Sequence, residues 1–457
     1  MFQKKRGTFL QRSIRPERVL AAGFLALIAL GTLLLMLPAA STTGQSLGLM
    51  DSLFTATSAV CVTGLVAVDT GTALTLFGQL VLLALIQLGG LGFMIFATLV
   101  MVALGRRISL RSRMLIRESM NTATLSGLVR LTRYYGLIAL TIELAGALLL
   151  AIRFVPRFGV GRGLYFALFH AVSAFCNAGF DLFGHFSSLT AFRGDPLVLL
   201  TVGALIILGG LGFSVIFETL NHRCRWKTLS LHAKLVLLMT GGLLALGTVF
   251  YALVEWSNPL TLAADGAGTG TRLLDAFFQS VTMRTAGFNS IDLSKMTEAS
   301  KLFSVCLMFV GASPASTGGG VKTTTISVLA LIVLSVARGQ NDVSILGRRL
   351  PTGLIRRALS ILFITLIILL AGTMVLTLAE RDSLPFIDLL FESASAIATV
   401  GVSAVGTPQL SLISRITLIP MMFFGRVGPL TMALALANKQ SETKNHLRYP
   451  EENIVIG

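Results

Sequence analysis

Four short strings of similar composition each close on a glycine. They are "DSLFTATSAVCVTGL" (51–65), "FALFHAVSAFCNAGF" (166–180), "DAFFQSVTMRTAGF" (275–288) and "DLLFESASAIATVGV" (388–402). A glycine at a turn allows backbone conformations that other residues resist, so that carbonyl oxygens can point to one side. A ring of such carbonyls replaces the hydration shell of a monovalent cation. The strings therefore predict coordination of an ion such as K⁺ or Na⁺ by backbone oxygens.

The candidate lining of this ion site is a triplet from each string. The triplets are Val62, Thr63 and Gly64; Asn177, Ala178 and Gly179; Thr285, Ala286 and Gly287; and Thr399, Val400 and Gly401. Their side chains are neutral, which suits K⁺ or Na⁺ better than Ca²⁺, for which carboxylates are preferred. The third string is one residue shorter, so its register stays open. Close helix packing is the alternative role of any single glycine, but four matching glycines in four similar strings favour an ion-selectivity filter.

A second glycine marker follows each string. The markers are "QLGGLGF" (87–93), "ILGGLGF" (207–213), "FVGASPASTGG" (309–319) and "FFGRVGPL" (423–430), and long apolar spans precede the strings at about 19–37, 137–154, 234–256 and 358–379. Each unit thus reads span, short segment, span. The short segments suit re-entrant half-helices, whose irregular backbone survives at membrane depth only where it is buried or lines water. The predicted fold is an all-α polytopic membrane protein with eight spans and four re-entrant pore helices, arranged pseudo-symmetrically around a central ion pore.

Composition and charge support this class. The chain is 54% hydrophobic and 13% charged, whereas soluble domains average about 25% charged residues. The net charge is +16, and Lys and Arg cluster in 1–18, 105–135, 221–235, 338–357 and the tail 438–457. By the positive-inside rule these segments, and so both termini, are cytoplasmic. The basic charge is therefore a topology signal, and a nucleic-acid partner is not expected.

These signals divide the chain as follows. The expected segments are a cytoplasmic N-terminus (1–18), repeat 1 (19–104), a basic cytoplasmic linker (105–135), repeat 2 (136–220), a cytoplasmic linker (221–233), repeat 3 (234–337), a basic cytoplasmic linker (338–357), repeat 4 (358–437) and a cytoplasmic tail (438–457). We expect the first apolar segment to be a retained span rather than a cleaved signal peptide.

The stretch "GASPASTGGGVKTTT" (311–325) interrupts the second span of repeat 3. As one helix, 301–337 would be about 55 Å long, nearly twice the hydrocarbon thickness of a bilayer. A helix–loop–helix accommodates that excess, and its loop must line a polar cavity under the filter. The stretch is not a Walker motif, because Val321 separates Gly320 from Lys322. A kinked packing helix is the alternative.

Arg426 lies in the corresponding span of repeat 4, where the other units have Gly90, Gly210 and Ala312. An arginine at membrane depth is costly and usually faces a cavity or a partner. Snorkelling to an interface is the alternative, and the apolar residues on both sides of Arg426 disfavour it. Glu143, within the first span of repeat 2, has no assigned role.

The four strings, the 311–325 stretch, "GRVGPLT" (425–431) and the ending "RYPEENIVIG" resemble the Trk/Ktr/HKT superfamily of potassium transporters, most closely the Ktr-type membrane subunits, over essentially the whole chain. The resemblance implies a K⁺-channel-like pore folded from one chain, with one glycine per filter loop. It also implies an intramembrane gate, for which the candidate residues are Gly311, Ser316, Thr317, Gly318, Gly319, Gly320, Lys322 and Arg426.

The resemblance further implies K⁺ uptake across the bacterial inner membrane, with Na⁺ as a second candidate ion. It implies a homodimer on a cytosolic regulatory ring of the KtrA type that binds ATP or ADP, with no cofactor in this chain. The linkers 105–135 and 338–357 are candidate docking surfaces for that ring or for anionic lipid headgroups. Two rivals remain: an alternating-access secondary transporter, disfavoured by the parallel repeats, and a membrane-embedded enzyme, disfavoured because the five His are scattered.

Overall fold

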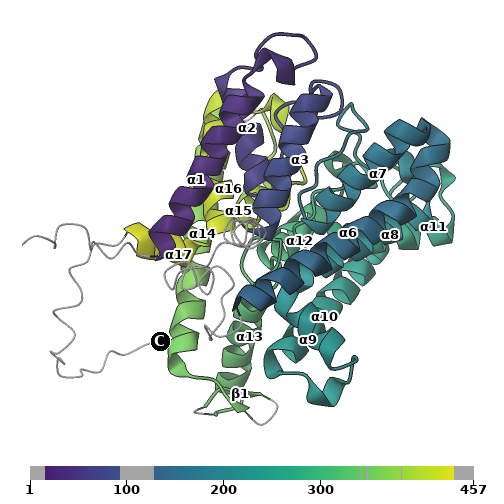
Figure 1. Ribbon diagram of the computed structural model, residues 1–457. Helices are drawn as coiled ribbons and strands as arrows, with labels where there is room; N and C mark the ends of the chain where they lie inside the picture. Colours follow the sequence, from purple (N-terminus) through teal and green to yellow (C-terminus); the bar gives the residue numbers. More distant parts are fainter. Residues whose placement is uncertain (1–15, 93–127, 341, 346–347, 382, 437–457) are drawn as a thin grey trace, which may run out of the picture.

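The computed structural model describes residues 16–92, 128–340, 342–345, 348–381 and 383–436 (Figure 1). These residues are mostly helical, and their sheet is a small ribbon of β1 (Ser344–Ile345) and β2 (Arg348–Arg349). Most of the predicted N-terminus and of the basic linker 105–135, and all of the tail 438–457, lie outside the described residues.

Among the described residues, four helices are long and apolar enough to cross a membrane. They are α1 (Pro16–Leu35), α6 (Leu128–Phe158), α10 (Leu231–Val254) and α14 (Thr352–Glu380). They overlap the apolar spans that the sequence predicts at the start of each unit, but α6 and α14 already begin within the predicted linkers 105–135 and 338–357. Their outer faces carry exposed leucines, such as Leu148 at 70% and Leu253 at 76%. Such faces suit a hydrocarbon surround, in which an apolar side chain loses nothing by being exposed.

A short helix follows each long one. The short helices are α2 (Leu49–Val60), α7 (Val160–Phe175), α11 (Thr269–Thr282) and α15 (Phe386–Ala398). At 12 to 16 residues they fall below the ~20 that span a bilayer. Their C-terminal turns are almost completely buried, and in each unit the long helix packs along the short one. The short helices therefore end inside the protein.

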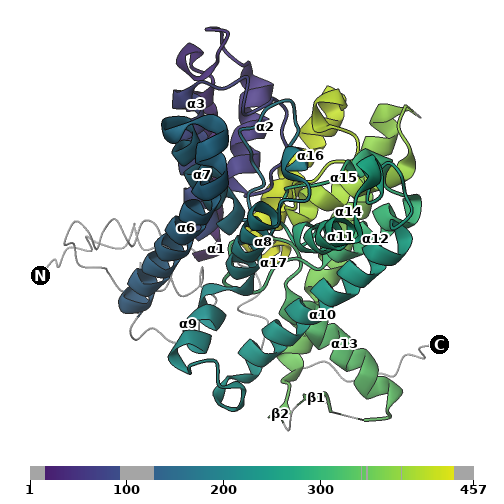
Figure 2. The same cartoon turned by 90° about the vertical axis from the view of Figure 1, so that its right-hand side faces the viewer.

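A third group of helices completes the units: α3 (Leu76–Leu91), α8 (Pro196–Leu211), α12 (Glu298–Phe309) and α16 (Leu412–Val427). Each begins at a side-chain cap, supplied in turn by Thr75, Asp195, Thr297 and Ser411, as is typical of helix N-termini. Each also packs on the short helix of the following unit, α3 on α7, α8 on α11, α12 on α15 and α16 on α2. The four units, numbered 1 to 4 in chain order, thus form a closed ring of contacts (Figure 2).

Three of these helices end at a glycine that lies within their glycine marker. α3, α8 and α16 end at Gly92, Gly212 and Gly428, whose φ values are 83°, 89° and 95°. Beyond Gly212, α9 (Phe213–Asn221) turns away from α8 by 96°, and beyond Gly428 the chain continues as α17 (Pro429–Leu436). The sequence predicts such a break in unit 3 alone. Glycine tolerates the positive φ that ends a helix in this way.

In unit 3 the break is a longer loop. The chain leaves α12 at Phe309 and becomes helical again in α13 (Thr323–Ala337). The first three residues of α13, expected in the loop 311–325, are therefore helical, and the loop ends at Lys322. We call residues 310–322 the inner loop.

Candidate functional site

The chain takes one backbone conformation after all four short helices. Left-handed φ values occur at Val62 (54°), Asn177 (59°), Thr285 (65°) and Thr399 (52°), and again two residues later at Gly64 (94°), Gly179 (71°), Gly287 (81°) and Gly401 (92°). Positive φ is rare for β-branched residues, and it persists only where the surrounding structure imposes it. The structure brings all twelve filter candidates to equivalent places, with Thr285 and Gly287 of unit 3 in the same register as the others. We call 62–64, 177–179, 285–287 and 399–401 the glycine loops.

In units 1, 2 and 4 the turn that ends the short helix explains the first left-handed residue. In unit 1 the Val62 amide donates to the Ala59 carbonyl at 3.1 Å, and the Thr63 amide donates to the Ser58 carbonyl at 2.8 Å. The same pair of bonds recurs in units 2 and 4. This is a Schellman motif, which satisfies the last carbonyls of a helix. The negative ends of the helix dipoles therefore point at the glycine loops.

Hydroxyl groups behind the loops hold the glycines in place. Ser58 Oγ accepts from the Gly64 amide and Ser395 Oγ from the Gly401 amide, both at 3.0 Å. In unit 2, Ser173 Oγ donates to the carbonyl after the glycine at 2.7 Å. Sequence reasoning did not assign these serines, although all three lie six residues before their glycine. These bonds tie the Gly64 and Gly401 amides and the Phe180 carbonyl to the last turns of their short helices.

The glycine loops lie against one another in chain order, and the ring closes. A Cβ atom on Gly64 would lie 2.5 Å from the Ala178 oxygen, and one on Gly179 would lie 2.5 Å from Gly287 Cα. A Cβ atom on Gly287 would lie 2.9 Å from the Val400 oxygen, and one on Gly401 would lie 1.9 Å from the Thr63 oxygen. Real Cβ atoms do not approach so closely, so each position requires glycine. The ring offers neutral backbone oxygens, the ligand type that suits a dehydrated monovalent cation.

The second glycine markers let α3, α8 and α16 pack directly behind this ring. A Cβ on Gly89, Gly209 or Gly425 would lie within about 2 Å of a short-helix carbonyl, those of Val60, Phe175 and Ile397 respectively. In unit 3 a Cβ on the equivalent Gly311 would instead lie 2.3 Å from the Gly319 oxygen of the inner loop. The inner loop therefore takes the space that a helix occupies elsewhere.

Backbone hydrogen bonds dock the inner loop on unit 2. The amides of Ser313 and Thr317 donate to the carbonyls of Gly210 and Gly209, at 3.0 and 3.2 Å. The Phe213 amide at the start of α9 donates to the Ala315 carbonyl at 3.0 Å. The bend of α8 at Gly212 frees these groups for pairing. Ser313 and Thr317 are fully buried, so the loop is part of the packed interior.

The inner loop also touches the glycine loop of unit 2 from below. Thr317 Oγ1 lies 3.0 Å from the Phe175 carbonyl, to which it donates, and 3.2 Å from Asn177 Oδ1. Asn177 Nδ2 in turn donates to Thr285 Oγ1 of unit 3 at 3.2 Å. A hydrogen-bonded chain therefore links the loop to two of the four glycine loops.

Three consecutive glycines bring the inner loop under the other glycine loops. A Cβ on Gly318 would lie 2.2 Å from Thr285 Oγ1, and one on Gly319 would lie 2.2 Å from Thr399 Oγ1. Gly320 has a φ of 69°. Lys322 Nζ turns back to the Gly318 carbonyl at 2.7 Å, and Ser316 Oγ donates to the Ser313 carbonyl at 2.5 Å. The loop therefore lies under units 2, 3 and 4.

Arg426 connects the inner loop to unit 1. Its Nη1 donates to the Thr317 carbonyl, and its Nη2 donates to the carbonyls of Gly89 and Gly90, the latter at 3.0 Å. Gly89 and Gly90 lie in the last turn of α3, where free carbonyls favour a cation. The guanidinium therefore completes the layer of contacts beneath the ring.

Glu143, to which sequence reasoning assigned no role, lies behind the glycine loop of unit 2. It is 3% exposed, and Gln87 Nε2 of α3 donates to its two carboxylate oxygens at 3.0 and 3.2 Å. The Cys176 sulfur lies 3.9 Å from one of them. No local pattern marks this residue, because its partners come from two other helices.

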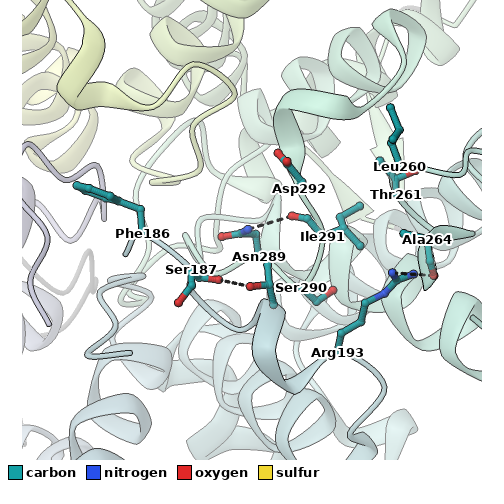
Figure 3. A pocket seen from close by; sticks show the side chains of 11 residues that line it. Phe186, Ser187, Arg193, Leu260, Thr261, Ala264, Asn289, Ser290, Ile291 and Asp292 are labelled. Atoms are coloured by element: carbon teal, nitrogen blue, oxygen red, sulfur yellow. Dashed lines mark hydrogen bonds between the residues drawn. The ribbon is translucent and has the colours of Figure 1, made fainter. Parts of the chain in front are cut away.

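A pocket of about 460 Å³ lies between the segments that follow the glycine loops of units 2 and 3 and the segment that joins α10 to α11. Its lining includes Ser187, Asn289, Ser290 and Asp292, and it is bordered by Arg193 (Figure 3). Among the described residues, no group of three or more His, Cys, Asp or Glu could hold a metal ion. The pocket lining therefore adds the Asp292 carboxylate to the hydroxyl, amide and backbone oxygens.

Comparisons with known proteins agree with this arrangement. The sequence profile of the TrkH family, described as a cation transport protein, matches residues 3–447. The chain is 42% identical to the Ktr system potassium uptake protein B of Bacillus subtilis, over 97% of each chain. It is 39% identical to the potassium/sodium uptake protein NtpJ of Enterococcus hirae, over 98% of each chain.

A solved structure gives the same fold. The potassium transporter TrkH from Vibrio parahaemolyticus matches with a TM-score of 0.71 at 16% identity, over 95% of this chain and 87% of that one. At that identity the match supports the architecture alone. Because the family profile covers nearly all of the sequence, this chain belongs to the TrkH family of membrane cation transport proteins.

Proposed function

We propose that this chain is the ion-translocating, channel-like subunit of a potassium uptake system of the Ktr type. The observation that carries the proposal is the closed ring of four glycine loops, with their left-handed residues in equivalent places. The names of the relatives, potassium uptake and potassium/sodium uptake proteins, support K⁺ as the main ion and Na⁺ as a second one. The four short helices are then pore helices, and the units are four span–pore loop–span repeats with eight crossings.

In this proposal K⁺ enters from the outside, sheds water among the carbonyls of the glycine loops and passes inward. The membrane potential drives it, at about 2.3 kcal/mol per charge for each 100 mV. The inner loop is the gate, because it lies directly under the ring and is held there by hydrogen bonds rather than by a continuous helix. Arg426 adds a positive charge in the same layer, which opposes cations until it moves.

The proposed assembly has a homodimer of this chain in the bacterial cell membrane, both termini in the cytoplasm, and a regulatory ring of the KtrA type below. ATP or ADP would bind that partner. The ribbon β1–β2 supplies a candidate contact, since it carries Arg348 and the exposed pair Arg349–Asp342. α13 begins at the end of the inner loop, and the ribbon follows α13 in the chain, so a partner bound there could act on the gate through α13.

Uptake by cells that lack their own K⁺ systems tests the proposal. Expression of the wild-type chain with a Ktr-type regulatory partner should restore growth at limiting K⁺ and give Rb⁺ uptake that increases with membrane potential. Uptake that depends stoichiometrically on a co-transported ion, and saturates with voltage, would instead support the alternating-access transporter.

Deleting Ser316–Gly320 is expected to raise K⁺ flux and to make it independent of the regulatory partner. The deletion removes the Thr317 and Gly318 contacts beneath the glycine loops while leaving the loops themselves unchanged. Rb⁺ uptake with and without the partner measures the effect. A deleted chain that reaches the membrane and stays fully dependent on the partner would argue that the gate lies elsewhere.

A pH dependence is expected from Asp181, at the outer side of the unit 2 glycine loop. Its burial, with the Asp69 carboxylate nearby, raises the pKa of Asp181 to about 7. The carboxyl therefore loses its proton as the external pH rises from 6 to 8, adding a negative charge that concentrates cations. Rb⁺ uptake at limiting concentration should increase over that interval, and Asp181→Asn should flatten the increase.

Asp292→Asn is the matched control for the pH experiment. Partial burial acts to raise the pKa of Asp292, but hydrogen bonds from Ser294 and Lys295 hold it below its ordinary value. Asp292 is consequently ionised throughout pH 6 to 8, and its loss should leave the slope of uptake against pH intact. A slope that survives in Asp181→Asn would assign the titration to another group.

A further inference from the structure

Ion pairs join consecutive units at the outer starts of the short helices. Lys301 Nζ on α12 lies 2.6 Å from Asp388 Oδ1 on α15, which links unit 3 to unit 4. Arg415 Nη1 on α16 lies 2.9 Å from Asp51 Oδ1 on α2, which links unit 4 back to unit 1. Lys301 and Arg415 stand ten residues before Gly311 and Gly425, and both aspartates stand thirteen residues before the glycine of the next loop. The two contacts are therefore equivalent.

The remaining two junctions have related contacts. Gln79, ten residues before Gly89, accepts a hydrogen bond from the Tyr165 hydroxyl of α7 at 3.2 Å. Arg193 Nε lies 2.8 Å from Asp275 Oδ2 of α11. Arg193 comes from the segment before α8 and also donates to the Ala264 carbonyl at 3.2 Å (Figure 3). Each of the four junctions thus has one polar contact to a short helix.

We propose that these four contacts, named the junction contacts, are positioning contacts that set the preference of the glycine-loop ring for K⁺ over Na⁺. The inference rests on the proposed function. The contacts lie in the first turn of α2 and α15 and near the middle of α7 and α11, and a glycine loop follows the end of each of these helices. From Asp388 to Thr399 the helix is about 16 Å long at 1.5 Å per residue. A shift or rotation at its start therefore moves the carbonyls that line the ring.

Burial argues for a positioning role over a purely stabilising one. The side chains of Lys301 and Asp388 are 8% and 11% exposed, and that of Asp275 is fully buried. Replacing a buried ion pair by apolar residues is often neutral for stability, whereas the pair does fix one geometry. Arg415 and Asp51 are 22% and 32% exposed, and the Gln79–Tyr165 contact is neutral. Selectivity should therefore depend more on the buried ion pairs than on the exposed or neutral contacts, and most of all on the Lys301–Asp388 junction.

The test replaces the Lys301–Asp388 pair without leaving a buried charge. The double variant Lys301→Met/Asp388→Leu should fold and take up Rb⁺, but the external Na⁺ concentration that halves Rb⁺ uptake should fall about tenfold, a size typical of coupled residues. The exchanged pair Lys301→Asp/Asp388→Lys should recover part of the wild-type selectivity. Lys295→Met is the matched control, because it breaks an exposed Lys–Asp pair of 3.2 Å within unit 3 and should change nothing.

The outcomes separate the two proposals. A wild-type chain without K⁺ or Rb⁺ uptake would overturn the proposed function. A transporting wild type with a folded double variant of unchanged Na⁺ inhibition would overturn the junction proposal alone. Should the double variant not reach the membrane, Arg415→Met/Asp51→Leu replaces it at a more exposed junction. Its expected result is a smaller fall in the same direction, and unchanged selectivity there would equally overturn the proposal.

Discussion

Replacing Gly401 by alanine should abolish K⁺ uptake while leaving the chain folded in the membrane. The residue has a φ of 92°, and a Cβ atom there would lie 1.9 Å from the Thr63 oxygen and 2.8 Å from Gly64 Cα. The left-handed conformation alone costs a non-glycine residue about 1–2 kcal/mol. The added Cβ would also push the Thr63 carbonyl out of its place in the ring. Rb⁺ uptake measures the loss, and membrane abundance shows that folding is retained.

Gly159→Ala is the control that separates the clash from the backbone strain. Gly159 has a φ of 81°, close to that of Gly401, but nothing lies within 4 Å of the added Cβ. The variant should therefore be modestly destabilised and still transport. Normal uptake by a folded Gly401→Ala variant would contradict the four-loop filter and favour an alternating-access mechanism.

Replacing Arg426 by glutamine should raise K⁺ flux and reduce its dependence on the regulatory partner. The guanidinium bridges the Thr317 carbonyl of the inner loop and the Gly89 and Gly90 carbonyls of α3. A hydrogen bond to a charged group is worth about 1.5–3 kcal/mol. Losing one such bond from the closed state would increase the open population about tenfold to a hundredfold. Rb⁺ uptake without the partner should show the increase.

Arg426→Lys distinguishes the two ways in which this residue could close the path. Lysine keeps the positive charge but not the forked donor geometry. The Arg426→Lys variant would therefore keep an electrostatic barrier but lose the hydrogen bonds that hold the inner loop to α3. We expect raised flux in Arg426→Lys as well, because the three acceptors come from two segments. Arg153→Gln serves as the control, since Arg153 is 52% exposed and pairs with Asp195 within its own unit. Lower flux in a folded Arg426→Gln variant would assign the residue to conduction instead.

The repeated organisation is legible in the sequence because its signals are local. The apolar spans correspond to α1, α6, α10 and α14, since a helix that faces lipid needs a continuous run of apolar residues. The glycine loops were located for the same reason, because a positive φ at the turn demands glycine within a few residues of a helix end. The length of 301–337 predicted the interruption between α12 and α13. The helix breaks at Gly212 and Gly428 went unpredicted, because a glycine before an apolar run fits a continuous helix equally well.

Contacts between distant segments were decided by the tertiary structure. Arg426 meets Thr317, 109 residues earlier, and Gly89, 337 residues earlier, and Arg415 meets Asp51 across 364 residues. Nothing near Arg426 in the chain indicates these acceptors, which are carbonyls that any residue carries. What the sequence by itself determined is therefore the set of loops that can offer oxygens to an ion. The packing of the four units decides how the loops are ordered in a closed ring and which residues lie beneath it. The reason is that each glycine loop contacts the next one only when the units are packed together.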